Sequence, residues 1–334
     1  MSMIRIKRLG YVAGSVLLLA ALVWPGQTVA QARGETVLRA ISWAAKGNAD
    51  NRIFEIFIDR INEAGKGIVR IDYVGGPEVI AVPNQVDAVG KGIVDIAHNY
   101  NTHSSVVPES ATYSISELTP AEERKSGYYD IIVESHKKMN VFPLVRMQTN
   151  AGFFIYSKKK IDTLDGLKGL KIRSHALYDT LLKPLGMATI HMPFSEAYGA
   201  LERGVIDAAP YTIHGGDLGL QQVAKFLLDE VFWQSGTAWV YFNSGKWNGL
   251  SKEGQAVFNQ VVTKLEADMA GIFEENNQKS RKLLKDAGVE FVKFKDPADR
   301  KKYYETVQTG FWEFAGKSMT PERTAQVKAS MTRK

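Results

Sequence analysis

The chain has 334 residues, of which 45% are hydrophobic and 23% charged, and its formal net charge is +6. These proportions are those of a soluble globular protein with one large or two medium domains, and they exclude a disordered or fibrous chain. The absence of cysteine excludes disulfides, thiol catalysis and cysteine-ligated zinc.

The first 32 residues have the pattern of a secretory signal peptide. Three basic residues within positions 1–10 precede the apolar run YVAGSVLLLAALVW at 11–24, and the small residues AQA follow at 30–32. The apolar run is shorter than the about 20 residues of a transmembrane helix, so an uncleaved anchor is the weaker alternative. We therefore predict a periplasmic protein that is not embedded in the membrane after cleavage. Removing the three positive charges leaves +3, which argues against a nucleic-acid partner.

The mature sequence then alternates strand and helix patterns, and it does so twice. We predict strands at 36–42, 68–74 and 93–98, with helices at 49–63 and 83–89 between them. The same order returns with strands at 170–173, 188–192 and 205–209 and helices at 177–185 and 195–203. The third units, AVGKGIVDIA and ALERGVIDAA, align with each other, although any helix–glycine–strand junction has this form. The repeat predicts two similar α/β lobes, each with a largely parallel sheet.

Further helices are predicted at 119–139, 251–287 and 297–315, and a last one begins at residue 321. The second of these would be about 55 Å long at 1.5 Å per residue, so we expect it to run along both lobes. The expected division is a first lobe of residues 33–149 plus about 240–270, and a second of 150–239 plus about 271–334.

Ligands of open α/β sheets bind at the carboxyl ends of the strands, so the residues that follow each strand are candidates for a cleft between the lobes. The first lobe supplies Ser42, Trp43, Glu78, Asn99 and Tyr100, and the second supplies Arg173, Ser174, His175, Phe194, Tyr211 and His214. This set contains one fixed cation and several aromatic rings. It predicts a site for an organic anion with an apolar body, whose carboxylate Arg173 would bind through two hydrogen bonds.

Each candidate also has a purely structural interpretation. Arg173 could be a surface arginine paired with an acidic residue, Glu78 a carboxylate at a helix N-terminus, and Asn99 the end of a strand. Single aromatic residues are more often part of the core than of a ligand site. The other four histidines, including His98, are expected to be structural.

Known catalytic signatures are missing from the sequence. It contains no G-x-S-x-G, no G-x-x-x-x-G-K-[ST], no G-x-G-x-x-G and no H-E-x-x-H. No histidine is spaced with a carboxylate to form a metal site, so we predict no metal, no cofactor and no catalytic residue. A secreted enzyme and the ligand-sensing module of a receptor remain as alternative classes.

The segment DGLKGLKIRSHALYDTLLKPLGMATIHMPFSEAYGALERGVIDAA at 165–209 resembles the solute-binding proteins of TRAP (tripartite ATP-independent periplasmic) transporters, of the DctP type. GGPEVIAVPNQVDAVGKGIVDIA at 75–97 and FNSGKWNGLSKEGQAVF at 242–258 resemble the matching segments of that family. The resemblance covers essentially the whole mature chain. It implies a periplasmic-binding-protein-like fold whose two lobes close on one small carboxylate and deliver it to the transporter's membrane subunits, without catalysis.

The resemblance also implies roles for particular residues. Arg173 falls on the arginine that binds the ligand carboxylate, Phe194 on the aromatic that packs on the ligand, and Glu78 on an acid that often faces the cleft. Tyr211 stands where many members have a ligand-contacting asparagine.

One further departure bears on the ligand. Many members carry a second arginine where this chain has Phe153 and Phe154, in NAGFFIYSKK at 150–159. Fewer charged groups and more aromatic surface favour a monocarboxylate with an aromatic or apolar body. A 2-oxo acid, a dicarboxylate and a sugar acid are the alternative ligands on the same fold.

Overall fold

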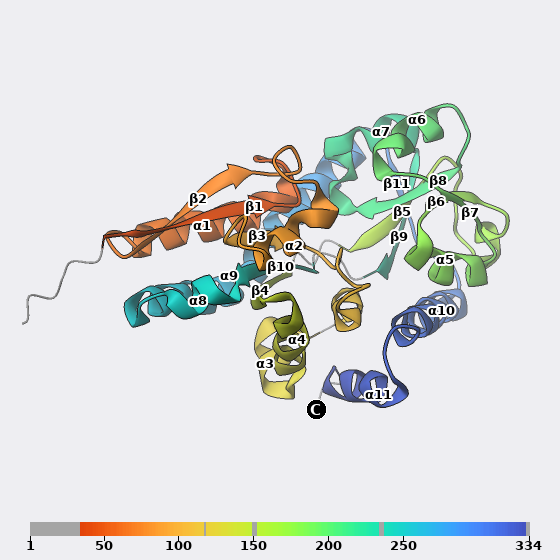
Figure 1. The fold of residues 1–334 in the computed structure, drawn as a ribbon. Coiled ribbons are helices and arrows are strands. Elements are labelled where there is room, and N and C mark those ends of the chain that lie inside the picture. The colour runs from red at the N-terminus through yellow and green to blue at the C-terminus, as the bar shows by residue number, and fades with distance from the viewer. Residues whose placement is uncertain (1–33, 117, 149–151, 234–236, 332–334) are drawn as a thin grey trace, which may run out of the picture. The chain divides into compact units, whose positions relative to one another are not determined.

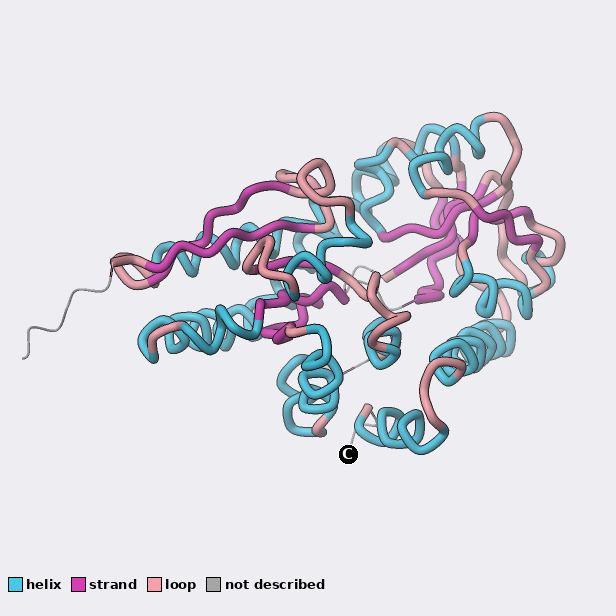
Figure 2. Tube along the Cα trace, in the orientation of Figure 1, coloured by secondary structure: helices cyan, strands magenta, loops and turns pink. Residues whose placement is uncertain are grey.

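The computed structural model describes residues 34–116, 118–148, 152–233 and 237–331. The predicted signal peptide at 1–32 lies outside them. Two β-sheets carry the described chain, each flanked by helices (Figures 1 and 2). The predicted α/β class with two lobes is therefore confirmed.

The first sheet has the strand order β2-β1-β3-β10-β4. Its strands are β1 (Thr36–Ser42), β2 (Val69–Gly75), β3 (Ile96–Asn99), β4 (Val141–Gln148) and β10 (Thr237–Asn243). β1 is parallel to β2 and to β3, whereas β10 is antiparallel to β3 and to β4. The helices of this lobe are α1 (Arg52–Ala64), α2 (Gln85–Gly90), α3 (Pro120–Ser126), α4 (Tyr128–His136) and α8 (Ser244–Gly249).

The second sheet has the order β11-β9-β5-β8-β6-β7. Its strands are β5 (Phe153–Ser157), β6 (Lys171–Ser174), β7 (Ala188–His191), β8 (Ala208–Thr212), β9 (Phe226–Trp233) and β11 (Glu290–Val292). The helices here are α5 (Ala176–Leu182), α6 (Ala197–Glu202), α7 (Leu220–Val223) and α10 (Pro297–Gly316). The chain passes from the first sheet to the second after β4 and returns after β9.

Short 3₁₀ helices connect several of these elements. They are η1 (Ala49–Asn51), η2 (Val82–Asn84), η3 (Pro108–Ile115), η4 (Lys137–Met139), η5 (Leu164–Leu167), η6 (Lys183–Leu185), η7 (Phe194–Glu196) and η8 (Ile213–Leu218). Three of them, η1, η7 and η8, follow strands and carry residues of the site described below.

The long helix α9 (Lys252–Asp286) contacts both lobes, as predicted. Phe258 and Leu265 in its first part are buried in the same apolar cluster as Phe57 of α1. Leu284 in its last turn belongs to a cluster under the second sheet. One helix thus contributes to the cores of both lobes, because buried apolar residues at helical spacing in its first two thirds face the first lobe and Leu284 near its end faces the second.

The predicted helix 119–139 is divided in the structure. Thr119 begins α3 with the expected capping box, but Gly127 has φ +83° and separates α3 from α4. A left-handed residue cannot continue a right-handed helix, and glycine adopts this conformation without strain. The predicted strand at 205–209 begins later, at Ala208, because Gly204 also has a positive φ of +73° and a turn follows it.

The C-terminal helices contact different lobes. Gly310 of α10 packs against the backbone of Thr180 in the second lobe. A Cβ on residue 310 would lie only 2.0 Å from the carbonyl oxygen of Thr180. In α11 (Pro321–Ser330), Val327 is buried in a cluster with Tyr128 of α4 in the first lobe. The chain's last helix therefore packs outside the lobe to which the sequence assigned it, and the exact lobe boundaries remain a prediction.

Candidate functional site

A cavity of about 370 Å³ is lined by residues from both lobes, a size within the range of small-molecule sites. Seven of the predicted site residues line it: Trp43, Tyr100, Phe153, Arg173, His175, Phe194 and Tyr211. The other lining residues are Asp50, His98, Asn101, Ser114, Leu177, Tyr178, Pro210, Thr212 and Ala238. Selecting the residues that directly follow strands thus identified more of the lining residues of the second lobe than of the first.

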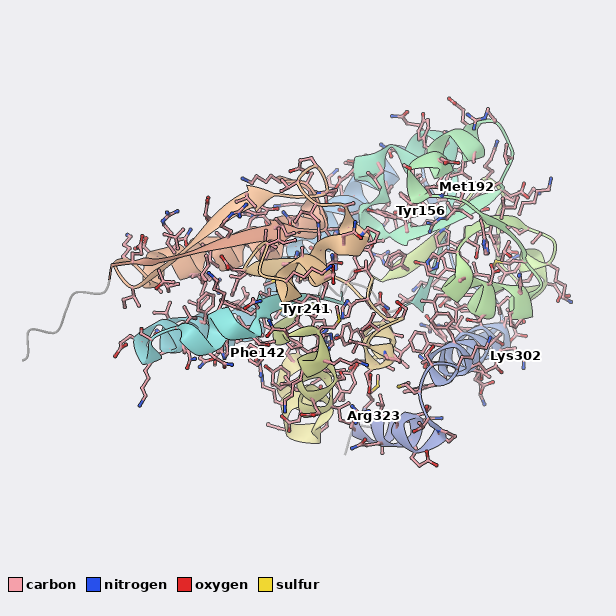
Figure 3. All side chains as sticks on the ribbon, viewed as in Figure 1. Phe142, Tyr156, Met192, Tyr241, Lys302 and Arg323 are labelled. Atoms are coloured by element: carbon pink, nitrogen blue, oxygen red, sulfur yellow. The ribbon has the colours of Figure 1, made fainter. Side chains whose placement is uncertain are left out.

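Arg173 is the only lysine or arginine among the residues that line the cavity. Its Nε donates a hydrogen bond to the carbonyl oxygen of Met192 at 3.1 Å. Met192 lies in the second lobe (Figure 3). In the described part of the chain no carboxylate forms an ion pair with this guanidinium, so its interpretation as an ion-paired surface arginine is wrong. Burial lowers the pKa of Arg173, yet a guanidinium stays charged at neutral pH. A half-buried cation of this kind can accept an anionic ligand.

Aromatic rings surround the arginine. The Arg173 guanidinium carbon lies 5.6 Å from the ring centre of Phe194 and 5.9 Å from that of Tyr178. Phe194 stacks on Tyr211 with ring centres 4.4 Å apart, and Phe153 meets Tyr211 edge to face at 6.1 Å. This wall offers apolar surface to the body of a ligand whose charged group meets the arginine.

Phe153 and Phe154 lie on opposite faces of β5, because successive side chains of a strand alternate. Phe153 is half-buried and lines the cavity. Phe154 is buried in the apolar cluster beneath the sheet, with the Arg281 guanidinium over its ring. Of the two phenylalanines in the predicted pair, the structure brings only Phe153 to the cavity.

The first-lobe wall contains polar groups that the sequence reasoning did not select. His98 was expected to be structural, yet it lines the cavity from the end of β3. Burial lowers its pKa to about 3, so its ring is neutral. Asp50 in η1 also lines the cavity, in the connection that follows β1 and Trp43. In the sequence Asp50 is the second residue of the helix predicted at 49–63, and that pattern does not mark it as a site residue.

His214 stands behind the cavity wall rather than on it. Its Nδ1 lies 2.5 Å from Oδ1 of Asp50, and its Nε2 lies 3.1 Å from Oδ1 of Asn277 on α9. Burial acts to lower the pKa of His214, but the hydrogen bond and negative charge of Asp50 outweigh it and raise that pKa above its ordinary value. His214 therefore orients Asp50 and does not itself line the cavity.

Three other predicted residues are engaged elsewhere. The Glu78 carboxylate accepts a hydrogen bond from the backbone N–H of Gly76, which lowers the pKa of Glu78. The Asn99 amide donates to the carbonyl oxygen of Val82 and so ties down the strand end. The Ser174 hydroxyl donates to the Asp179 carboxylate. None of the three is among the lining residues, and each side chain is held by a hydrogen bond within its own lobe.

Two α/β lobes with a small-molecule cavity at their strand ends define a solute-binding protein of the periplasmic-binding type. The chain belongs to the DctP family, described as bacterial extracellular solute-binding protein family 7, whose family model matches residues 42–317. Members of this family are periplasmic solute-binding proteins rather than enzymes. TRAP solute-binding proteins bind small organic acids and work with membrane subunits.

Known relatives agree with this assignment. The chain is 27% identical, over 72% of its length and 69% of the relative's, to the monocarboxylate 2-oxoacid-binding periplasmic protein of Nostoc sp.. A TRAP periplasmic solute-binding protein from Ochrobactrum anthropi superposes with a TM-score of 0.77 at 17% identity, covering 89% of this chain and 95% of that one. Another, from Roseobacter denitrificans with bound β-D-glucuronate, gives 0.72 at 18% identity and covers 89% and 100%. At these identities the two structures establish the fold alone.

None of the helices in the described ranges combines the length and apolar character needed to cross a membrane.

Proposed function

We propose that this protein captures a monocarboxylate with an aromatic or apolar body and delivers it to the membrane subunits of a TRAP transporter. The observation that carries the proposal is Arg173, the only Lys or Arg side chain of the cavity wall, unpaired with any acid in the described ranges and framed by aromatic rings. One guanidinium in an otherwise largely aromatic wall matches one carboxylate on an apolar body.

The proposal includes the way the protein works. The lobes close on the ligand, which requires that the ligand bind the closed state more tightly than the open one. Phe153, Phe194 and Tyr211 supply contact area, while Arg173 supplies charge and orientation. The protein acts in the periplasm after removal of the signal peptide, and it catalyses no reaction.

Three considerations favour a monocarboxylate over the other organic acids. The Nostoc relative is named for binding monocarboxylate 2-oxoacids. A dicarboxylate would bring a second negative charge into a cavity whose wall already contains the carboxylate of Asp50, and like charges repel at short range. A sugar acid needs many polar partners, and this wall is rich in aromatic rings instead.

The test is thermal unfolding of the protein with aromatic, aliphatic, 2-oxo, dicarboxylic and sugar acids in turn. A ligand at about 100 times its dissociation constant stabilises the folded state by about 2.7 kcal/mol, which raises the Tm by several degrees. We expect the largest rise with aromatic or aliphatic monocarboxylates. A rise confined to dicarboxylates or sugar acids would overturn the ligand assignment, and no rise with any acid would overturn the transport function.

A further inference from the structure

Two buried polar atoms of the first-lobe wall have no hydrogen-bond partner among the described residues. They are Nε1 of Trp43 and Nε2 of His98. Both residues line the cavity. Leaving a buried polar atom unpaired costs free energy, and the great majority of such atoms in proteins are paired. In a binding cavity, the missing partner points to the ligand.

The hydrogen bonds around Ser42 determine which nitrogen of His98 carries the proton. The Asn51 amide nitrogen donates to the Glu55 carboxylate at 3.3 Å, which turns the amide oxygen toward Ser42. The Ser42 hydroxyl, 2.6 Å from that oxygen, must donate to it, because an amide oxygen only accepts. With its only hydrogen used, the Ser42 oxygen accepts from Nδ1 of His98 at 3.1 Å. Nδ1 therefore carries the proton.

The other ring nitrogen of His98 is consequently an acceptor. Burial keeps the ring neutral, with a pKa of about 3, and a neutral imidazole protonated at Nδ1 has a lone pair at Nε2. Trp43 provides the opposite function, because an indole N–H can only donate. The first-lobe wall thus offers one unpaired donor and one unpaired acceptor.

A hydroxyl group has the chemistry to serve both atoms, since its oxygen accepts from an indole N–H and its hydrogen donates to an imidazole lone pair. A ketone oxygen accepts from Trp43 but leaves Nε2 of His98 unpaired. A methylene leaves both unpaired. The wall therefore distinguishes a hydroxy acid from its oxo and unsubstituted counterparts by hydrogen bonding, which gives much stronger discrimination than an apolar contact does.

The carboxylate of Asp50 adds to this preference. It is buried at the cavity wall, and among the described residues its Oδ2 accepts only a long hydrogen bond of 3.4 Å from the Tyr211 hydroxyl. A second hydrogen-bond acceptor on the ligand would be repelled by the Asp50 carboxylate, which also only accepts. A ligand donor would not.

We propose that the natural ligand is a hydroxylated monocarboxylate, with its carboxylate on Arg173 and its hydroxyl between Trp43 and His98. This inference rests on the proposed function and narrows its ligand class.

The experiment measures dissociation constants by isothermal titration of the protein with matched acids. One series is 3-phenylpropanoate, 3-phenylpyruvate and the phenylpropanoates hydroxylated at carbon 2, at carbon 3 or on the ring. A six-carbon aliphatic series runs in parallel. We expect one hydroxy acid to bind about tenfold or more tightly than both its oxo and its unsubstituted counterpart. If an oxo or unsubstituted acid binds within about threefold of the best hydroxy acid, the hydroxyl assignment is overturned while the proposed function stands. Absence of binding by every acid overturns both.

Variants then locate the preference in the two side chains. Trp43→Phe removes the donor and keeps an aromatic ring, and His98→Asn keeps a group near Nδ1 but removes Nε2. Each is expected to lower affinity for the best hydroxy acid about tenfold and to leave the unsubstituted acid within about twofold. His98→Gln, which places an amide oxygen near the lost nitrogen, should restore part of the preference. Equal losses for both acids would mean that the two residues only shape the wall, and the proposal would be wrong.

The matched control is Tyr303→Phe. The Tyr303 hydroxyl is likewise buried without a partner in the described ranges, but it lies in the second-lobe core and not on the cavity wall. This variant should keep the full preference for the hydroxy acid. If it loses that preference, the effect of the Trp43 and His98 variants is not local and the assignment fails. Two wall variants are used so that one remains as the test if the other does not fold.

Discussion

Asp50 and His214 join the two lobes beside the cavity: Oδ1 of Asp50 lies 2.5 Å from Nδ1 of His214, although 164 residues separate them in the chain. Both side chains are nearly fully buried. Asp50 follows the first strand of one sheet, and His214 follows β8 of the other. The pair therefore holds the strand ends of the two lobes together at the place where the candidate site lies.

Asp50→Asn should destabilise the protein, and more so at pH 6 than at pH 9. Asp50 raises the pKa of His214 in the folded state. The stability that this contributes is therefore complete below the unfolded-state pKa of about 6.5 and is lost as pH rises through the folded-state pKa. Urea unfolding of both proteins at the two pH values measures the difference. If the variant loses the same free energy of unfolding at both pH values, His214 is neutral in the folded protein and the prediction is wrong.

Arg173→Ala should weaken binding of the ligand by about 2–5 kcal/mol, as expected when one partner of a buried charge pair is removed. Isothermal titration with the best acid of the panel gives the loss, and circular dichroism checks the fold. The control is Arg203→Ala, which removes an exposed arginine from the same lobe outside the cavity wall. A loss of less than fivefold for Arg173→Ala would contradict its role in binding the carboxylate.

Phe153→Ala and Phe154→Ala form a matched pair on neighbouring positions. Phe154 is buried in the core, so its truncation should lower the free energy of unfolding by about 3–5 kcal/mol. Phe153 lines the cavity, so its truncation should cost less stability and reduce ligand affinity instead. Chemical unfolding and titration on both variants separate the two effects. The opposite result would mean that the alternation of β5 is misassigned.

A buried ion pair in the first lobe should be important for folding but not for binding. Nε of Arg146 donates to Oε2 of Glu123 at 2.9 Å, and both side chains are 1% exposed. Glu123→Gln should cost about 3–5 kcal/mol because it leaves a buried charge without its counter-ion. The double variant Glu123→Leu, Arg146→Met should recover much of this loss. Urea unfolding measures both, and ligand affinity should be unchanged because neither residue lines the cavity.

The sequence predicted the repeated α/β units well because their signals are local. Apolar residues at helical spacing define α1, and short β-branched runs ending in glycine turns define the strands. Strands β4, β5, β9, β10 and β11 were not placed, since their pairing partners lie far away in the chain. β10, for example, pairs with β3 and β4, whose residues precede it by roughly 90 to 150 positions.

The candidate site was predicted only in part, because local sequence signals mark some of its residues and not others. Residues directly after a strand, such as Trp43 and Arg173, have positions that the strand alone determines. Asp50 and His98 became visible only in three dimensions, because their significance depends on partners from other segments. The misplacement of Phe154 reflects a one-residue uncertainty, which in a strand exchanges one face for the other.

The place of β10 in the first sheet has a consequence for how the chain reaches its folded state. β4 has no other strand partner in that sheet, and β10 also covers one edge of β3. A nascent or truncated chain that ends before residue 237 would thus expose the edge of β3 and leave β4 without a sheet. Such open edges pair with other chains and promote aggregation. The first lobe, although it is encoded first, can be completed only after the second has been synthesised, so the two lobes cannot be produced as separate soluble halves by cutting the gene between β4 and β5.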